Sequence, residues 1–236
     1  MSEQKNYIDV EYEIVSAGPI VAPNFSHMAL AFVVDVSSSM GGTPINELNA
    51  ALNRFKAEVC EDKGTRRILD IAIISFNHET KIVQNFRSVT EMESVNLVAN
   101  GGTIMGQAVE TAIQLVSARS KEYNNTGAVP YKPWIVLISD GAPADNIDDV
   151  AREVRSLEER GKLKFWSLGV TGYDANTLKK FSKRVMQLEG YSFYGFIDWA
   201  AKSMRCVSES VPTEEPRLPD LPKEVKPDTN PMPEGW

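Results

Sequence analysis

The sequence lacks the cysteines that a disulfide framework or a cysteine-based zinc site would need. Only Cys60 and Cys206 occur among its 236 residues, and two thiols are too few for either role. We expect both to be buried and reduced. The sequence also contains no apolar run near the roughly 20 residues that cross a bilayer, and its N-terminal residues lack the apolar segment of a signal peptide. These absences predict a cytoplasmic protein that is not attached to a membrane.

Positive charge is scarce as well. The chain carries 25 basic and 32 acidic residues, for a formal net charge of -7. No Lys/Arg-rich block provides a local field for phosphate groups, so nucleic acid is not an expected partner. The two histidines, His27 and His78, do not lie in the sequence context of a nucleophile elbow, which disfavours a Ser-His-Asp hydrolase.

Apolar segments in the centre of the chain predict alternating strands and helices. Residues 28–34 and 134–139 are continuously apolar, which is typical of strands covered on both faces in a parallel sheet. Further strands are expected at residues 68–76, 80–86, 164–170 and 185–188. Apolar residues at spacings of three and four predict helices over residues 43–60, 146–160, 174–181 and 192–207, with another beginning near Met105.

This alternation predicts a doubly wound α/β fold, in which helices cover both faces of a mostly parallel sheet. The sheet should carry one antiparallel edge hairpin, because residues 68–76 and 80–86 are separated by a three-residue turn. In such sheets, ligands bind beyond the carboxyl ends of the strands, where the strand order reverses. Asp35 and Asp140 are each expected at such an end.

The two ends of the chain differ in composition from its centre. Residues 7–15 alternate apolar and acidic side chains, which predicts an edge strand followed by a linker. After Val211, prolines interleaved with acidic residues predict an extended tail that cannot form a core of its own. We therefore divide the chain into an N-terminal edge strand and linker (residues 1–25), a central domain (26–210) and a proline-rich acidic tail (211–236).

Oxygen-bearing side chains cluster at the predicted strand ends. Asp35, Ser37 and Ser39 place one carboxylate and two hydroxyls on alternate residues of the turn that leaves the first apolar strand. Thr103 follows two glycines and can add a fourth oxygen, while Asp140 can add a second carboxylate directly or through water. Such hard oxygen ligands suit Mg2+, with Mn2+ as an alternative. The predicted metal centre keeps a position open for the carboxylate of a partner protein.

Three motifs together resemble the von Willebrand factor A (VWA) family and its metal-ion-dependent adhesion site. They are Asp-x-Ser-x-Ser at a strand end, Gly-Gly-Thr before a helix, and an apolar strand that ends in Ser-Asp-Gly. The resemblance covers about residues 26–210 and implies a Rossmann-like fold. It also implies that the first metal loop holds Asp35, Ser37 and Ser39, the second Thr103 and the third Asp140.

A narrower resemblance points to bacterial VWA proteins of the tellurite-resistance TerY type. The segments Ser-Ser-Ser-Met-Gly-Gly-Thr-Pro-Ile and Gly-Gly-Thr-Ile-Met-Gly-Gln-Ala carry it. It implies a stress-response assembly with a kinase or a phosphatase. We therefore expect a non-enzymatic, Mg2+-dependent module that docks an acidic side chain of a partner protein. The alternative is a regulatory subunit of a metal chelatase or an AAA+ ATPase, or a weak metal-dependent phosphohydrolase.

Two nucleotide or phosphate chemistries are disfavoured by single residues. The glycines from Gly101 to Gly106 have the spacing of a phosphate-binding P-loop, but Gln107 stands where that loop requires lysine. A phosphoaspartate phosphatase needs a second acid two residues after its aspartate, and Ser37 occupies that position.

Overall fold

The computed structural model describes residues 16–228, so the edge strand predicted at residues 7–15 lies outside the described residues. Its centre is a seven-stranded sheet with the order β3-β2-β1-β4-β5-β6-β7. The strands are β1 (Met28–Asp35), β2 (Leu69–Phe76), β3 (Thr80–Ser88), β4 (Trp134–Ser139), β5 (Lys164–Gly169), β6 (Val185–Leu188) and β7 (Val225–Pro227). Strands β2, β1, β4, β5 and β6 pair in parallel, which confirms the predicted fold class.

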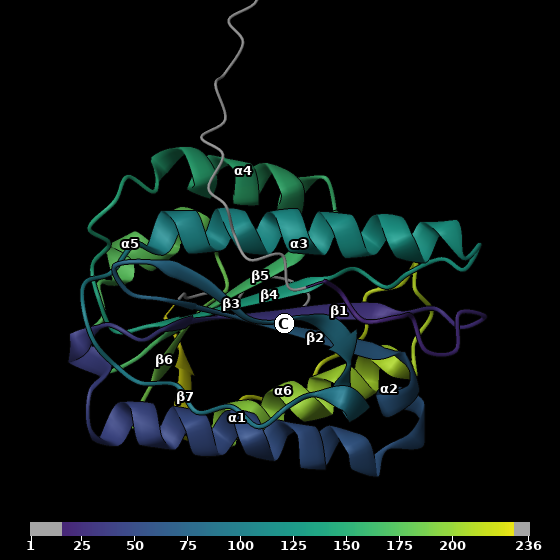
Figure 1. Ribbon diagram of the computed structural model, residues 1–236, viewed down its shortest axis with the longest axis horizontal. Coiled ribbons are helices and arrows are strands. Elements are labelled where there is room, and N and C mark those ends of the chain that lie inside the picture. Colours follow the sequence, from purple (N-terminus) through teal and green to yellow (C-terminus); the bar gives the residue numbers. More distant parts are fainter. Residues whose placement is uncertain (1–15, 229–236) are drawn as a thin grey trace, which may run out of the picture.

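Helices cover both faces of the sheet (Figure 1). The α-helices are α1 (Thr43–Glu61), α2 (Lys63–Ile68), α3 (Met105–Asn125), α4 (Asp148–Glu159), α5 (Ala175–Phe181) and α6 (Phe193–Ser208), and two short 3-10 helices are η1 (Ser38–Met40) and η2 (Val89–Glu91). α3, α4 and α5 lie on one face, and α1, α2 and α6 on the other. The pattern of apolar residues missed α2, because six residues are too few to show a helical period. No helix among residues 16–228 is both long and apolar enough to cross a membrane.

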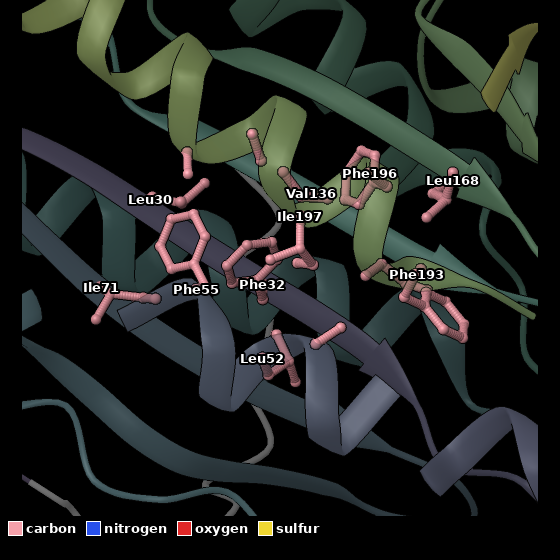
Figure 2. Close-up of a cluster of buried hydrophobic side chains, with 14 of the residues drawn as sticks. Leu30, Phe32, Leu52, Phe55, Ile71, Val136, Leu168, Phe193, Phe196 and Ile197 are labelled. Carbon is pink, nitrogen blue, oxygen red and sulfur yellow. The ribbon is translucent and has the colours of Figure 1, made fainter. Parts of the chain in front are cut away.

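The side chains of β1 alternate between two apolar cores, because successive residues of a strand point to opposite faces. Leu30 and Phe32 belong to the core that includes α1 and α6, whereas Ala31 and Val33 belong to the core that includes α3. Figure 2 shows the first of these cores, in which Phe32 lies beside Phe55 of α1 with ring centroids 5.4 Å apart. Burial on both faces explains why this segment is apolar without interruption.

Both edges of the sheet are antiparallel. The pairing of β2 with β3 confirms the predicted hairpin. The pairing of β6 with β7 was not predicted, since β7 lies in the proline-rich tail. Val225 of β7 is buried, and the indole N–H of Trp199 donates a hydrogen bond to the carbonyl of Pro219 at 3.0 Å. Within residues 211–228, β7 therefore extends the sheet and Pro219 contacts α6, while the division of the chain at residues 25 and 210 stays a prediction.

An ion pair anchors the tail at Glu215. Its carboxylate lies 2.5 Å from Nζ of the buried Lys164 and also contacts Lys132. We expect Glu215→Ala to lower the free energy of unfolding by about 1–2 kcal/mol, because a buried ammonium loses its partner. Urea denaturation measures this loss. Glu214→Ala is the matched control, since Glu214 is exposed and makes no ion pair within residues 16–228. Equal losses for both variants would refute a specific anchor.

Candidate metal centre

The candidate site lies where the order of the sheet reverses. β1 pairs in parallel with β2 on one side and with β4 on the other. Asp35 is the last residue of β1, and Asp140 directly follows β4. The chain continues from β1 into α1 and from β4 into α4, which lie on opposite faces. The loops after these two strands therefore diverge from one edge of the sheet and leave room for a ligand between them.

Asp35 is fully buried, and both oxygens of its carboxylate accept hydrogen bonds. The backbone N–H of Ser37 donates to Oδ1 at 2.8 Å, and the hydroxyl of Ser139 donates to Oδ2 at 2.6 Å. Ser139 is itself held in place, because it pairs with Gly169 of β5 and its carbonyl accepts a hydrogen bond from the N–H of Val170, the residue directly after β5. These contacts fix the orientation of the carboxylate.

The serine hydroxyls connect the loop after β1 with the loop after β4. Ser37 Oγ lies 3.0 Å from Ser39 Oγ, and Ser39 Oγ donates a hydrogen bond to Asp140 Oδ1 at 2.9 Å. η1 begins at Ser38 and turns the chain sharply, so that side chains two residues apart reach the same point. A carboxylate and two hydroxyls are thus linked in one chain of contacts.

Thr103 approaches the same point from the loop before α3. A β-carbon at Gly141 would lie 3.6 Å from Thr103 Oγ1 and 3.8 Å from Asp35 Oδ2, so both oxygens face one small space. The N–H of Ala144 donates to the carbonyl of Thr103 at 2.8 Å and joins the two loops. The structure therefore gathers the five predicted residues, and we call them the oxygen cluster: Asp35, Ser37, Ser39, Thr103 and Asp140.

Two supports of the cluster were not predicted. Ser139 immediately precedes Asp140, so its position in the sequence could have identified it. The turn between β2 and β3 could not be identified in this way. The carbonyl of Asn77 accepts a hydrogen bond from the N–H of Ile104 at 2.6 Å. Gly101 has a φ of +73°, and a β-carbon there would lie 2.2 Å from His78 Nδ1, so this position requires glycine.

The charges of the cluster favour a bound cation. Burial raises the pKa of Asp35, and the nearby Asp140 raises it further, while the hydrogen bonds from Ser139 and Ser37 act in the opposite direction. A positive ion beside both carboxylates would relieve the cost of this burial and repulsion. Within residues 16–228, no group of three or more His, Cys, Asp or Glu side chains is suited to hold a metal. The oxygen cluster, with two carboxylates and three hydroxyls, instead fits a hard divalent cation.

Comparison with known proteins identifies similar domains. The family model for the von Willebrand factor type A domain matches residues 29–200, which include the whole oxygen cluster. The VWFA domain-containing protein ORF892 of Acidianus two-tailed virus is 28% identical over 142 residues. The match covers 59% of this chain and 15% of the viral protein, so the chain corresponds to a small part of that relative.

Several solved structures share the fold at low sequence identity. The vWF domain of the type V pili tip protein Mfa5 from Porphyromonas gingivalis has a TM-score of 0.58 and 13% identity, over 76% of this chain and 95% of that chain. The pilus adhesin SpaC from Lactobacillus rhamnosus GG has a TM-score of 0.62 and 11% identity, over 80% and 31%. Proximal thread matrix protein 1 from the mussel byssus, with a zinc-occupied MIDAS motif, has a TM-score of 0.53 and 19% identity, over 78% and 45%.

Proposed function

Because this chain belongs to the von Willebrand factor type A domain family, we propose that its oxygen cluster holds one divalent cation and docks an acidic side chain of a partner protein. Domains of this family generally mediate metal-dependent protein interactions. The proposal treats this chain as a binding module without catalytic activity. Its supporting observation is the convergence of three loops on the buried carboxylate of Asp35.

The residues of the cluster have distinct roles in this proposal. Asp35 and Asp140 supply negative charge, whereas the hydroxyls of Ser37, Ser39 and Thr103 supply neutral oxygens. The hydrogen bonds from Ser37 N–H and Ser139 hold the Asp35 carboxylate in place before an ion arrives. A bound cation would provide the positive charge that attracts a carboxylate from outside the chain. We propose Mg2+ as the cation, with Mn2+ as an alternative, because all five groups are oxygen ligands.

We also propose a specific biological setting for this chain within the family. The segments around Ser38 and Gly102 support a TerY-like protein in a bacterial stress-response assembly, with a kinase, a phosphatase or an ATPase as the partner. We also propose a cytoplasmic location. Cys60 and Cys206 are both unpaired, which suits a reducing compartment. The expectation that both thiols are buried was wrong, since both are partly exposed.

Capture of partners with and without the metal tests the proposed function. The immobilised protein should retain a partner from bacterial lysate in the presence of Mg2+ and release it when EDTA is added. Asp140→Ala should abolish this retention, because it removes the carboxylate that Ser39 contacts. Asp198→Ala is the control, since Asp198 lies on α6 and pairs with Lys202 outside the cluster. Partners that stay bound in EDTA and to Asp140→Ala would contradict metal-dependent docking.

The affinity for Mg2+ should depend on pH through Asp35. A raised pKa means that a proton competes for this carboxylate at a higher pH than for an ordinary aspartate, whose pKa is about 3.9. Below the pKa of Asp35 in the folded protein, we expect the affinity to fall about tenfold per pH unit, because binding displaces one proton. Isothermal titration calorimetry measures both the affinity and the protons released. An affinity that does not fall on acidification, with no proton released on binding, would contradict this role.

Acidification should weaken the binding of Mg2+, but it should stabilise the folded state of the metal-free protein. The ionised form of Asp35 is costly to bury, so its destabilising effect is present above the pKa in the folded state and disappears as the pH falls through it. Relative to the Asp35→Asn variant, the metal-free protein should therefore gain stability on acidification. Parallel urea denaturation of the two proteins measures this difference.

A further inference from the structure

An extended segment before the metal loop is attached to α1 by two asparagine side chains. Asn53 accepts a hydrogen bond from the N–H of Val95 and donates to its carbonyl, at 2.7 and 2.8 Å. One helical turn earlier, Asn49 makes the same pair of bonds with Leu97, at 2.7 and 2.9 Å. Figure 1 shows the chain that leads into α3 running along α1. Each asparagine thus satisfies both backbone groups of one residue, as a neighbouring strand would.

Asn96 and Val98 direct their backbone N–H and C=O groups away from α1. In an extended chain, the N–H and C=O groups of successive residues point to opposite sides. Val95 and Leu97 are buried and bonded to α1, whereas Asn96 and Val98 are exposed, Val98 at 69%. Within residues 16–228, no hydrogen bond occupies the backbone groups of Asn96 or Val98. The segment therefore presents an unpaired strand edge on the side away from α1.

This edge borders a groove of about 300 Å³. The opposite wall is the hairpin of β2 and β3, which contributes Val83 and Lys81, and Val36 also lines the groove. Val36, Val83 and Val98 provide apolar surface for a side chain. Lys81 and Glu79 both line the groove, both are exposed and neither forms an ion pair with a described residue, so the groove offers a partner one charge of each sign.

The groove borders the loop that carries part of the oxygen cluster, because Val36 lines the groove and lies between Asp35 and Ser37 in the chain. The N–H of Asn100 donates to the carbonyl of Val36, the residue directly after Asp35, at 2.8 Å. The N–H of Ser38 donates to the carbonyl of Gly101 at 3.1 Å. Val98 precedes Thr103 by five residues, a separation of at most about 18 Å along an extended chain. A short extended peptide can therefore reach both the strand edge and the cluster.

We propose that an extended segment of the partner protein pairs as a β-strand with residues 96–98. The same segment carries the acidic side chain that docks at the oxygen cluster. This inference rests on the proposed function and specifies the form of its partner. The occupant is an extended segment with one acidic residue for the cluster and an apolar residue for the valine-lined groove. Backbone hydrogen bonds to Asn96 and Val98 supply affinity, and the groove supplies selectivity, as in other cases of strand addition.

Amide hydrogen exchange in the free protein tests whether the backbone edge of residues 96–98 is unpaired. In the free protein, we expect the amides of Val95 and Leu97 to exchange with deuterium at least tenfold more slowly than those of Asn96 and Val98. Nuclear magnetic resonance of the full chain measures each amide separately. Equal protection of all four amides would overturn the proposal, because the edge would then already be paired.

A peptide library tests the docking itself. The probe is a pool of labelled nine-residue peptides with a fixed central aspartate and all other positions varied, selected on the full chain in Mg2+. A selected peptide should bind Val98→Pro at least tenfold more weakly than Val98→Ala, because both substitutions remove the valine side chain and only proline also removes the N–H. N-methylation of single peptide amides should cause a similar loss at alternate positions, and it leaves the protein unchanged.

The outcomes separate this inference from the proposed function. Binding that needs Mg2+ and Asp140 but is insensitive to Val98→Pro and to N-methylation would overturn strand addition and leave metal-dependent docking intact. If the library yields no Mg2+-dependent peptide, both proposals fail. A synthetic peptide of residues 7–15 is also tested, because its acidic residues alternate with apolar ones. Tighter binding of that peptide than of any selected one would overturn the choice of a partner protein as the occupant.

Discussion

Asp35→Asn is expected to abolish the rise in melting temperature that Mg2+ causes, while the metal-free fold stays intact. The substitution removes a charge but keeps the shape of the side chain. Its oxygen can still accept from the N–H of Ser37, and its amide group can donate to Ser139, whose hydroxyl also accepts from Gly141. Since burial disfavours the ionised carboxylate, the unfolding free energy of the metal-free variant should stay within about 1 kcal/mol of the parent.

The expected loss is large because ligand binding stabilises only the folded state. Mg2+ at 100 times its dissociation constant adds about 2.7 kcal/mol, which raises the melting temperature of a chain of this size by about 5–10 °C. Differential scanning calorimetry in Mg2+ and in EDTA measures the rise. Asp149→Asn is the control, because Asp149 is an exposed residue of α4 outside the cluster. A variant at Asp35 that kept the full rise would show that the ion binds elsewhere.

Asp70→Ala is expected to be the most destabilising single substitution that we predict. Asp70 of β2 and Arg119 of α3 are almost completely buried, and their closest atoms are 2.6 Å apart. The hydroxyl of Tyr123 also donates to Asp70 Oδ2, at 2.7 Å. Removal of the carboxylate would leave a buried guanidinium without its main partner, which costs about 3–5 kcal/mol. The melting temperature should fall by about 6–20 °C.

Two further variants distinguish the cost of leaving the buried Arg119 unpaired from a general destabilisation by mutation. Glu122→Ala removes the half-exposed partner of the same arginine and should cost less than about 1 kcal/mol, because solvent screens that contact. Asp70→Ala combined with Arg119→Met should be more stable than Asp70→Ala alone, because no unpaired charge remains. Denaturant unfolding of the four proteins measures these differences. A double variant less stable than Asp70→Ala would refute the cost of an unpaired arginine.

The predicted fold was confirmed most closely where the sequence is strongly periodic or continuously apolar. The apolar segments at residues 28–34 and 134–139 became β1 and β4, the two central strands that carry the candidate site. β7 was not predicted, because a three-residue strand with a proline has little strand character. It forms because Val225 finds a buried position beside β6.

The candidate site was predicted from residue types and motifs, and its supports were not. Asp35 and Asp140 stand at strand ends, where the sequence places them. Their role as metal ligands stays a prediction. The sequence pattern did not single out Asn49 and Asn53, which lie within the helix predicted at residues 43–60. Only the folded chain brings them against Val95 and Leu97, about 40 residues later.

The sequence by itself determined which segments are buried on both faces, which residues carry oxygen ligands and in what order they occur. Those properties follow from the apolar pattern and from side-chain chemistry, which are local. The tertiary structure alone decided that Ser139 orients Asp35, that His78 covers Gly101 and that the backbone of Asn96 and Val98 stays unpaired. These contacts join residues distant in the chain or depend on which side of a segment is already bonded, and no local pattern encodes either property.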